Sequence, residues 1–497
     1  MHIGIDLGTS SIKAILIDDN QKLICTASET LKLFNPKIGY YEQNPNDWVE
    51  ATIKCLNTFK KYNSKKFKAV ESIGISGQMH GATLIDKNDK ILRKCILWND
   101  TRSIKECFEL EKKFPLLRKE SGNIAMPGFT SPKLLWINRN EKAIFKKIHK
   151  VLLPKDYLRL KLTGNYCTDM SDASGTLWLN VKKRKWSEGL IEASNLTLKN
   201  MPDLVEGNEV SGFVLNSFLN EFGFDKKVFV AGGAGDQAAG AIGSGVTESN
   251  QSIISLGTSG VYFSPTSKFS SNTNQAVHSF CHCLKDTWHH MSVMLSATNC
   301  LNWFCNLYGI DIKKAENKAK KYFLNSIDLN KAPYFFPYLT GERTPYNNSH
   351  LRGSFHMIHT STSIESMFYS IIEGISFGIK DGFQAVHKVS TISEKIYLIG
   401  GGSKSIFWAN LLSSILNQKI IVGEGSDLGP ALGAARLGML STNQYKKNEV
   451  IVNLKKIKEC SPSNYLTEKL EKRYKVWKKI VSVNEPIARN LIEISDV

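Results

Sequence analysis

Ile3-Gly4-Ile5-Asp6-Leu7-Gly8-Thr9-Ser10 opens the chain with an apolar run and a polar turn, and Ser255-Leu256-Gly257-Thr258-Ser259 has the same ending 249 positions later. In both places a second apolar run follows Leu-Gly-Thr-Ser, so each half of the 497-residue chain is predicted to begin with the same hairpin. The repeat indicates two similar domains, residues 1–245 and 246–497, which join at a flexible polar break, Gly243-Ser244-Gly245.

Short β-branched segments alternate with longer amphipathic segments along most of the chain, which is typical of an α/β fold. Strands are predicted over residues 3–7, 12–18, 23–29 and 70–76. A helix is predicted over residues 47–60, capped by Asn46 or Asp47 after Pro45. A basic amphipathic surface helix is predicted over residues 466–481.

The composition excludes several classes of protein. Hydrophobic residues make up 42% and charged residues 22%, which excludes a disordered chain. No apolar run approaches the roughly 18 residues that span a bilayer, and the N-terminus reads as a strand rather than a signal segment. We therefore expect a cytoplasmic location and no membrane partner. The ten cysteines are scattered, so we also expect reduced thiols. A zinc site at Cys281-His282-Cys283 is disfavoured because C-x-C alternates between the two faces of a strand.

The net charge of +18 would favour a nucleic-acid partner if it were concentrated. The 64 basic residues are 53 Lys and 11 Arg, however, and the lysines are spread along the chain. Readers of bases and phosphates depend more on the planar fork of arginine. We therefore expect a solvated lysine-rich surface, no nucleic-acid partner and small-molecule substrates. The sequence leaves a homodimer open.

The two Leu-Gly-Thr-Ser turns are suited to phosphate, because glycine lets the backbone approach the ligand and successive N–H groups can form an anion-binding concavity. Ordinary hairpin turns are the alternative interpretation. Asp6 precedes the first turn only, and a carboxylate beside a phosphate cradle is repulsive unless a cation bridges them. Asp6 therefore indicates Mg²⁺.

A second glycine-rich turn, Gly232-Gly233-Ala234-Gly235-Asp236, joins an apolar strand to a helix of small residues. Asp236 could be a plain helix cap. A dinucleotide fingerprint is excluded because the next strand ends in Ser255-Leu256 rather than in an acid, and a P-loop motif is absent from the sequence.

Two further motifs follow predicted strands. Gly400-Gly401-Gly402 would let a flat ring such as adenine lie against the backbone, although a close helix–strand crossing is the alternative. Gly77-Gln78-Met79-His80 and Trp98-Asn99-Asp100 place polar residues where a sugar pocket would have its wall. A lone histidine such as His80 is more often structural than ligand-binding.

Together these residues resemble the FGGY family of carbohydrate kinases, within the fold shared by actin, hexokinase and the heat-shock chaperone ATPases. The resemblance implies two similar RNase H-like domains on either side of a catalytic cleft. It covers essentially the whole chain, through the motifs above and through Met126-Pro127-Gly128-Phe129-Thr130, Leu153-Pro154-Lys155-Asp156-Tyr157, Asp169-Met170-Ser171-Asp172-Ala173-Ser174, Gly341-Glu342-Arg343-Thr344-Pro345 and Gly429-Pro430-Ala431-Leu432-Gly433.

The resemblance also implies roles. Asp236 would be the general base, and Asp6 would work with Mg²⁺ and the phosphates of ATP. The other implied contacts are Thr9, Ser10, Lys13, Gly257 and Thr258 for phosphates, Gly401 and Gly402 for adenosine, and Met79, His80, Gln237 and, in second rank, Trp98, Asn99 and Asp100 for the sugar.

The implied reaction is ATP-dependent phosphorylation of D-xylulose at its C5 hydroxyl. Alternatives are a kinase of ribulose, glycerol or gluconate, and a non-catalytic ATP-driven clamp or sugar sensor, which would not need Asp236. Two residues depart from the family pattern: Gln237 stands where ketopentose kinases commonly have Asn, and Met357 stands where Gly is usual. Gln237 resembles glycerol kinases, but these have Arg-Glu where this chain has Met79-His80, so a ketopentose is still favoured.

Overall fold

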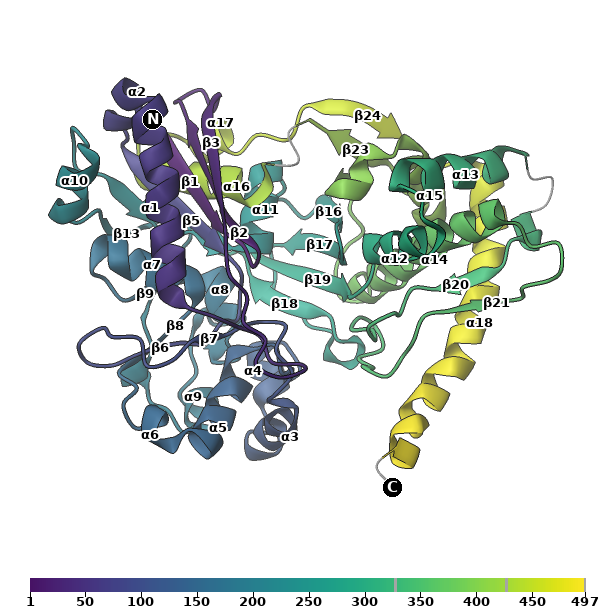
Figure 1. The fold of residues 1–497 in the computed structure, drawn as a ribbon, viewed down its shortest axis with the longest axis horizontal. Coiled ribbons are helices and arrows are strands. Elements are labelled where there is room, and N and C mark those ends of the chain that lie inside the picture. The colour runs from purple at the N-terminus through teal and green to yellow at the C-terminus, as the bar shows by residue number, and fades with distance from the viewer. Residues whose placement is uncertain (326–328, 425–427, 496–497) are drawn as a thin grey trace.

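The computed structural model describes residues 1–325, 329–424 and 428–495, and it contains two large mixed sheets side by side (Figure 1). The first sheet contains, in spatial order, β13 (Val210–Phe213), β14 (Phe229–Ala231), β5 (Ser72–Gly77), β1 (His2–Leu7), β2 (Ser11–Ile17) and β3 (Leu23–Thr30), and β15 (Ala234–Gly235) also pairs with β5. The second contains β18 (His278–Cys281), β19 (Trp288–Met294), β17 (Gly260–Thr266), β16 (Gln251–Leu256), β22 (Lys395–Ile399), β23 (Ile420–Gly423) and β24 (Lys456–Cys460).

The two sheets share one topology around their central strands. β1 pairs antiparallel with β2 and parallel with β5, and β16 pairs antiparallel with β17 and parallel with β22. Each sheet also carries an antiparallel strand beyond its last parallel strand, β13 beside β14 and β24 beside β23. The predicted duplicated hairpin and the α/β class are therefore confirmed.

The helices lie on both sides of the sheets (Figure 1). The principal ones are α1 (Pro45–Tyr62), α3 (Ile104–Lys113), α5 (Thr130–Asn140), α7 (Pro154–Thr163), α11 (Asp236–Ser244), α12 (Thr298–Tyr308), α13 (Ile312–Asn325), α14 (Ile364–Val386), α15 (Ile406–Leu416), α16 (Gly429–Ser441) and α18 (Asn464–Ser495). Shorter helices include α4 (Leu117–Ser121) and α8 (Met170–Ser174). None of the helices in the described part of the chain is long and apolar enough to cross a bilayer.

The structure differs from the sequence-based expectation in two local details. Helix α1 begins at Pro45 and is capped by the Asn44 side chain, two residues before the predicted start, because proline suits the first helical position, where its missing N–H is not needed. The predicted flexible break at 243–245 is a buried helix end: Gly243 and Ser244 belong to α11, and Gly245 closes it with φ of 73°.

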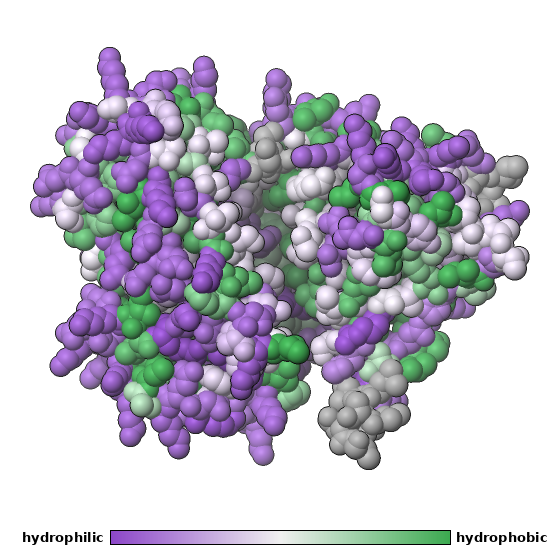
Figure 2. All heavy atoms as spheres, in the orientation of Figure 1, coloured by the Kyte–Doolittle hydropathy of each residue, from purple (hydrophilic) through white to green (hydrophobic). Residues whose placement is uncertain are grey.

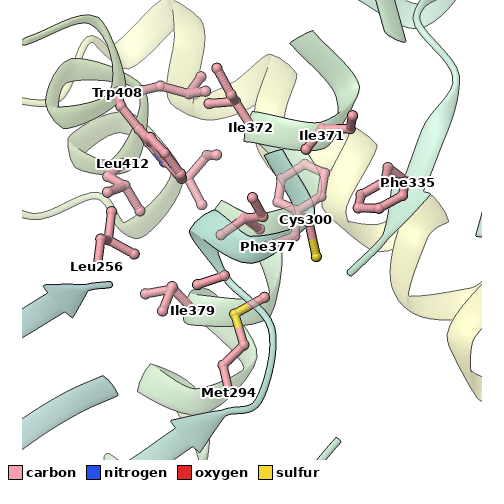
Figure 3. Packing of buried hydrophobic residues seen from close by; sticks show 14 of the residues in the cluster. Leu256, Met294, Cys300, Phe335, Ile371, Ile372, Phe377, Ile379, Trp408 and Leu412 are labelled. Carbon is pink, nitrogen blue, oxygen red and sulfur yellow. The ribbon is translucent and has the colours of Figure 1, made fainter. Parts of the chain in front are cut away.

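The second half of the chain has its core where α14 and α15 pack on β16 and β17. Leu256 of β16 lies near Leu412 and Trp408 of α15, and Phe377 and Ile379 of α14 complete the cluster (Figure 3). Trp408 Nε1 donates to Ser376 Oγ at 2.9 Å, so the buried indole has a partner. This packing fixes the end of β16, where the second Leu-Gly-Thr-Ser turn begins.

Helix α16 belongs to the second half of the sequence but packs on the first sheet, against β1 and β5, and crosses α11. The crossing has no room for side chains. A Cβ on Gly433 would lie 1.8 Å from the Ala239 carbonyl oxygen, and a Cβ on Gly74 of β5 would lie 1.7 Å from the Ala434 carbonyl oxygen. The division of the chain at residue 245 therefore stays a prediction, while the halves are joined by backbone-to-backbone packing.

Gly433→Ala is expected to destabilise the protein by about 1–3 kcal/mol, because the new methyl group must push the α11 and α16 backbones apart. Urea unfolding measures the loss. Gly240→Ala is the matched control on α11, since its Cβ would meet nothing closer than 3.9 Å. Equal stabilities for the two variants would contradict the tight crossing.

Candidate active site

The strand register of the first sheet brings both predicted catalytic carboxylates to one edge. Asp6 on β1 is paired with Ser76 on β5, and Ser76 is paired on its other side with Ala234, two residues before Asp236. Neighbouring strands lie about 4.8 Å apart, so β1 and β15 lie about 10 Å apart on either side of β5, and Asp236 follows β15 directly. Two carboxylates at that spacing can face one small ligand or cation.

Both residues are half-buried. Burial raises the pKa of Asp6 to about 6, and the hydrogen bond from Ser76 Oγ at 3.1 Å opposes this shift. Burial, and secondarily the negative charge of Asp6, raises the pKa of Asp236 to about 7. A carboxylate with a pKa near neutrality is matched to general base catalysis.

The carboxylate pair fits Mg²⁺. The described residues contain no cluster of three or more His, Cys, Asp or Glu side chains that could hold a metal by themselves. Mg²⁺ usually binds through one or two carboxylates together with substrate phosphates and water. Asp6 beside the first Leu-Gly-Thr-Ser turn is a ligand of this kind, and a cation there would relieve the repulsion between Asp6 and Asp236.

The first phosphate turn is held by a ring of hydrogen bonds around Thr9. Trp98 Nε1 donates to Thr9 Oγ1 at 2.9 Å, and Thr9 Oγ1 donates to Gln78 Oε1 at 3.1 Å. Gln43 Nε2 donates to the Thr9 carbonyl at 2.7 Å and Gln78 Nε2 donates to Gln43 Oε1 at 2.8 Å. The turn is therefore preorganised, and Trp98, predicted for the sugar, lies against it.

Ser10 is exposed at the tip of the same turn, and Lys13 of β2 is the cross-strand partner of Asp6. Gln78 was predicted only as part of the sugar-pocket wall, and Gln43 was not predicted for the site. A long-range pairing of two glutamines leaves no periodic signal in the sequence.

Met79 lies against the Gly232–Asp236 turn, and His80 lies against Gly175, the residue after α8. A Cβ on Gly235 would meet Met79 Sδ at 2.8 Å, and a Cβ on Gly175 would meet the His80 ring at 2.5 Å. His80 Nδ1 bonds the Gly175 carbonyl at 2.7 Å, which leaves Nε2 as the ring nitrogen for a ligand. Burial lowers the pKa of His80 to about 3, so the imidazole is neutral.

His80 also has φ of 70°, a left-handed conformation that is uncommon for a non-glycine residue. The buried Lys133 supports it, because its Nζ donates to the carbonyl oxygens of His80 and Gly128, both at 2.8 Å. Burial lowers the pKa of Lys133 to about 7. Lys133 was missed from sequence, since a fully buried lysine is not expected on a helix such as α5.

Asn99 and Asp100 differ in what they offer. The Asn99 Oδ1 atom is buried and accepts no hydrogen bond from the described residues, so it is suited to a sugar hydroxyl. Asp100 is occupied: its oxygens accept from Tyr41 N at 2.7 Å and from Arg102 Nε and a terminal Arg102 nitrogen at 2.9 and 2.7 Å. The structure thus gives Asp100 a supporting role in the loop after β7 (Cys95–Ile96).

The second half supplies the other two predicted turns at adjacent strand ends. Ser255 of β16 is paired with Ile399 of β22, so Gly257-Thr258 and Gly401-Gly402 follow neighbouring parallel strands. Thr298 Oγ1 donates to the Gly257 carbonyl at 2.7 Å and fixes the Gly257-Thr258 turn. A Cβ on Gly402 would lie 2.7 Å from the Leu256 Cβ, so this glycine is needed for close packing against β16, as the alternative interpretation expects. The role of Gly401 and Gly402 toward adenosine stays a prediction.

A cavity of about 260 Å³ lies between the two halves. Its walls include Asp236, Gln237 and Gly240 of α11. The second half contributes Ser255 and Val261, which belong to the β16–β17 hairpin. The face shown in Figure 2 is hollowed between the two halves, and hydrophilic residues are spread over both of them. Asp236 is thus brought to a cleft that both halves line, with Asp6, Met79 and His80 nearby.

Other sequence features have plain structural outcomes. Met357 follows β21 (Ser354–His356) with φ of 61°, which explains why glycine would suit that position. All ten cysteines are free thiols, and Cys281 and Cys283 are buried. Asp236 is the first residue of α11 after the N-cap Gly235, so it is not the N-cap itself.

Known proteins are similar to this chain in sequence and in architecture. The description "FGGY family of carbohydrate kinases, N-terminal domain" matches residues 1–243, and its C-terminal counterpart matches residues 253–442. A xylulose kinase of Escherichia coli (strain K12) is 44% identical over 90% of this chain and 91% of its own length, and one of Bacillus subtilis (strain 168) is 35% identical over 90% and 89%.

Among solved structures, one titled as a "xyloylose kinase" from Brucella ovis superposes with a TM-score of 0.94 at 39% identity, covering 98% of this chain and 99% of that one. The predicted two-domain fold, that of the actin- and hexokinase-type ATPases, is confirmed. The chain therefore belongs to the FGGY family of carbohydrate kinases.

Proposed function

We propose that this sugar kinase transfers the γ-phosphoryl group of ATP to the C5 hydroxyl of D-xylulose, with Asp236 as the general base. The observation that carries the proposal is the position of Asp236: a carboxyl group with a pKa of about 7 lies in the cavity between the halves, one residue from the Gly235 that covers Met79. The curated relatives named xylulose kinase supply the substrate class.

The first step is binding. The Thr9 turn and the Gly257-Thr258 turn would hold phosphates from opposite halves, and Gly401 and Gly402 would line the adenosine. Mg²⁺, held by Asp6 when bound, would neutralise charge on the phosphates. Lys13 of β2 would add a positive charge beside Asp6.

In the chemical step Asp236 accepts the proton of the C5 hydroxyl while that oxygen bonds to the γ-phosphorus and the bond from phosphorus to the β–γ bridging oxygen of ATP breaks. ADP and D-xylulose 5-phosphate leave. Phosphoryl transfer needs positioning and charge stabilisation more than covalent chemistry, so a base, a cation and two phosphate turns are sufficient. Closure of the two halves would keep water out of the cavity.

D-xylulose is expected to exceed glycerol in kcat/KM by at least about 100-fold, or roughly 2.7 kcal/mol of transition-state stabilisation. The reason is that the Met79–His80 wall has one apolar side and one imidazole nitrogen, and a site built to bond a hydroxyl rejects an analogue that leaves it unpaired. ATP consumption with D-xylulose, D-ribulose, L-ribulose, glycerol and gluconate is the measurement.

His80→Ala should remove most of the preference for D-xylulose and leave the slow hydrolysis of ATP without sugar nearly unchanged. If glycerol matched D-xylulose, Gln237 would be the better guide to the substrate and the assignment to a ketopentose would fail. If no sugar stimulated ATP consumption, the non-catalytic clamp or sensor would be favoured.

A further inference from the structure

Beneath the Gly232–Asp236 turn lies a buried cluster of five charged side chains that the reaction does not use. Lys155, Asp156 and Arg159 come from α7, and Asp169 and Asp172 flank the start of α8, and all five side chains are fully buried. Lys155 Nζ lies 2.6 Å from Asp156 Oδ1, 2.8 Å from Asp169 Oδ1 and 3.3 Å from Asp172 Oδ2. A terminal nitrogen of Arg159 lies 2.9 Å from Asp156 Oδ1.

The cluster forms hydrogen bonds with the Gly232–Asp236 turn, called the catalytic turn below, at two points. A terminal nitrogen of Arg159 donates to the Gly232 carbonyl at 2.6 Å, at the start of the turn. Gly235 N donates to Ser171 Oγ at 3.1 Å, immediately before Asp236, and Ser171 Oγ donates to Asp169 Oδ2 at 2.5 Å. The two ends of the turn are therefore tied to the same set of buried ions.

Three of the five residues of the turn are glycines, so side chains of the turn itself contribute little to fixing its conformation. Gly233 has φ of 75°, and a Cβ on it would lie 2.0 Å from the Ile75 carbonyl oxygen, so the backbone takes a path open to glycine alone. Glycines in series give a flexible segment unless hydrogen bonds restrain it. Backbone hydrogen bonds from Gly232 N to the Glu209 carbonyl at 2.8 Å and from Gly233 N to the Gly207 carbonyl at 2.9 Å restrain the start of the turn, and β15 pairs with β5. The bonds to Arg159 and Ser171 add side-chain anchors at both ends.

The charges of the cluster balance when one carboxyl group is protonated. Burial, reinforced by Asp156 and Asp169 and opposed by Lys155, raises the pKa of Asp172 well above its ordinary value. Two cations then face two carboxylates. A buried ion cluster of this kind is weak evidence for stability, because desolvation offsets the attraction, and it is better suited to holding groups in one arrangement.

We propose that Ser171 and Arg159 are positioning residues for phosphoryl transfer: anchored by Asp169 and Asp156, they hold the turn so that Asp236 points into the cavity. This inference rests on the proposed role of Asp236 as base. It adds that the Leu-Pro-Lys-Asp-Tyr and Asp-Met-Ser-Asp segments act through the backbone of the catalytic turn rather than on the sugar.

Ser171→Ala tests the proposal with the smallest change, since it removes one hydroxyl. We expect kcat to fall at least about fivefold, the size of one lost hydrogen bond, with the KM for ATP unchanged within twofold. The acid limb of the kcat–pH profile should also move to lower pH, because a freer Asp236 gains contact with water and its ionised form is less penalised. The negative charge of Asp6 also raises the pKa of Asp236, and Asp6 itself is unchanged in the variant.

Ser121→Ala is the matched control. Ser121 is equally buried in the first half, and its Oγ donates to the Leu117 carbonyl at 2.8 Å and accepts from Asn123 N at 3.1 Å, so the same kinds of bond are lost away from the turn. It should lower the melting temperature as much as Ser171→Ala does, without moving kcat or the acid limb.

Arg159→Lys is an independent second variant, because it keeps the buried charge but cannot hold the Gly232 carbonyl and Asp156 together. It should reproduce the loss of kcat. An unchanged kcat and acid limb in Ser171→Ala, or equal losses of kcat in Ser171→Ala and Ser121→Ala, would overturn the proposal. Asp236→Asn measured in parallel separates the two ideas: if it stays active, the base assignment itself fails.

Discussion

Asp236→Asn is expected to lower kcat by about 10²- to 10⁴-fold, the contribution that a positioned general base typically makes. Asparagine has nearly the same shape, and Asp236 Oδ1 accepts from Gln237 N at 2.7 Å, a bond that an amide oxygen can also accept. ATP affinity should therefore stay close to that of the wild type. Turnover with D-xylulose and a titration with ATP are the measurements.

The pH dependence of the same variant provides a second readout. With a pKa of about 7 in the ligand-free enzyme, Asp236 must lose its proton to act as base, so kcat/KM of the wild type should fall as pH drops through about 7. The limb should be absent in Asp236→Asn. Activity within about threefold of the wild type would reduce Asp236 to a residue that merely starts α11.

The folding stability that Asp236 contributes should fall as pH rises, whereas the activity that depends on Asp236 should rise. The raised pKa means that the folded protein holds this proton more tightly than the unfolded chain, so the stabilisation is complete below pH about 4 and is lost as pH rises through about 7. At pH 8 the wild type carries a buried charge that the amide lacks. Asp236→Asn should accordingly melt at the same or a higher temperature at pH 8, which separates loss of function from loss of fold.

Asp6→Ala is expected to lower kcat by about 100-fold or more and to raise the Mg²⁺ concentration needed for half-maximal activity, because a metal's charge stabilisation is worth several kcal/mol and each 1.36 kcal/mol is tenfold in rate. The variant keeps the Met79–His80 wall, so D-xylulose binding should be little affected. A Mg²⁺ titration of turnover is the measurement.

Asp18→Ala is the control for Asp6→Ala. Asp18 lies at the far end of the same hairpin, where its Oδ1 accepts from Asn20 N and Lys22 N, so the variant loses an acidic side chain from the hairpin without approaching the cleft. An unchanged Mg²⁺ requirement and normal turnover in Asp6→Ala would remove Asp6 from the site.

The features that were predictable from sequence are those encoded by local pattern. The duplicated Leu-Gly-Thr-Ser turn predicts two related sheets. The turns at Gly235-Asp236 and Gly401-Gly402 each follow an apolar run, and the end of that run marks the end of a strand. Because the carboxyl ends of neighbouring parallel strands meet at one edge, Asp6 and Asp236 come close once the strands are known.

The features that were missed depend on contacts between distant segments. Gln43 and Gln78 meet around Thr9, and Lys133 supports His80, through pairings that no spacing reveals. The Gly429-Pro430-Ala431-Leu432-Gly433 segment was noted only as a family motif, and nothing local shows that α16, which it begins, packs on β1 and β5 of the other half. Such contacts are set by tertiary packing.

The position of α16 has a consequence for how the protein forms during translation. The faces of β1 and β5 that α16 covers are shaped by Gly4 and Gly74, whose α-carbons lie against the α16 backbone. At about 5–20 residues per second, a ribosome that has finished residue 245 needs roughly 10–40 s to reach residue 441. For that interval the first sheet lacks the helix that covers β1 and β5 in the folded protein, so its packing can be completed only after most of the second half has been made.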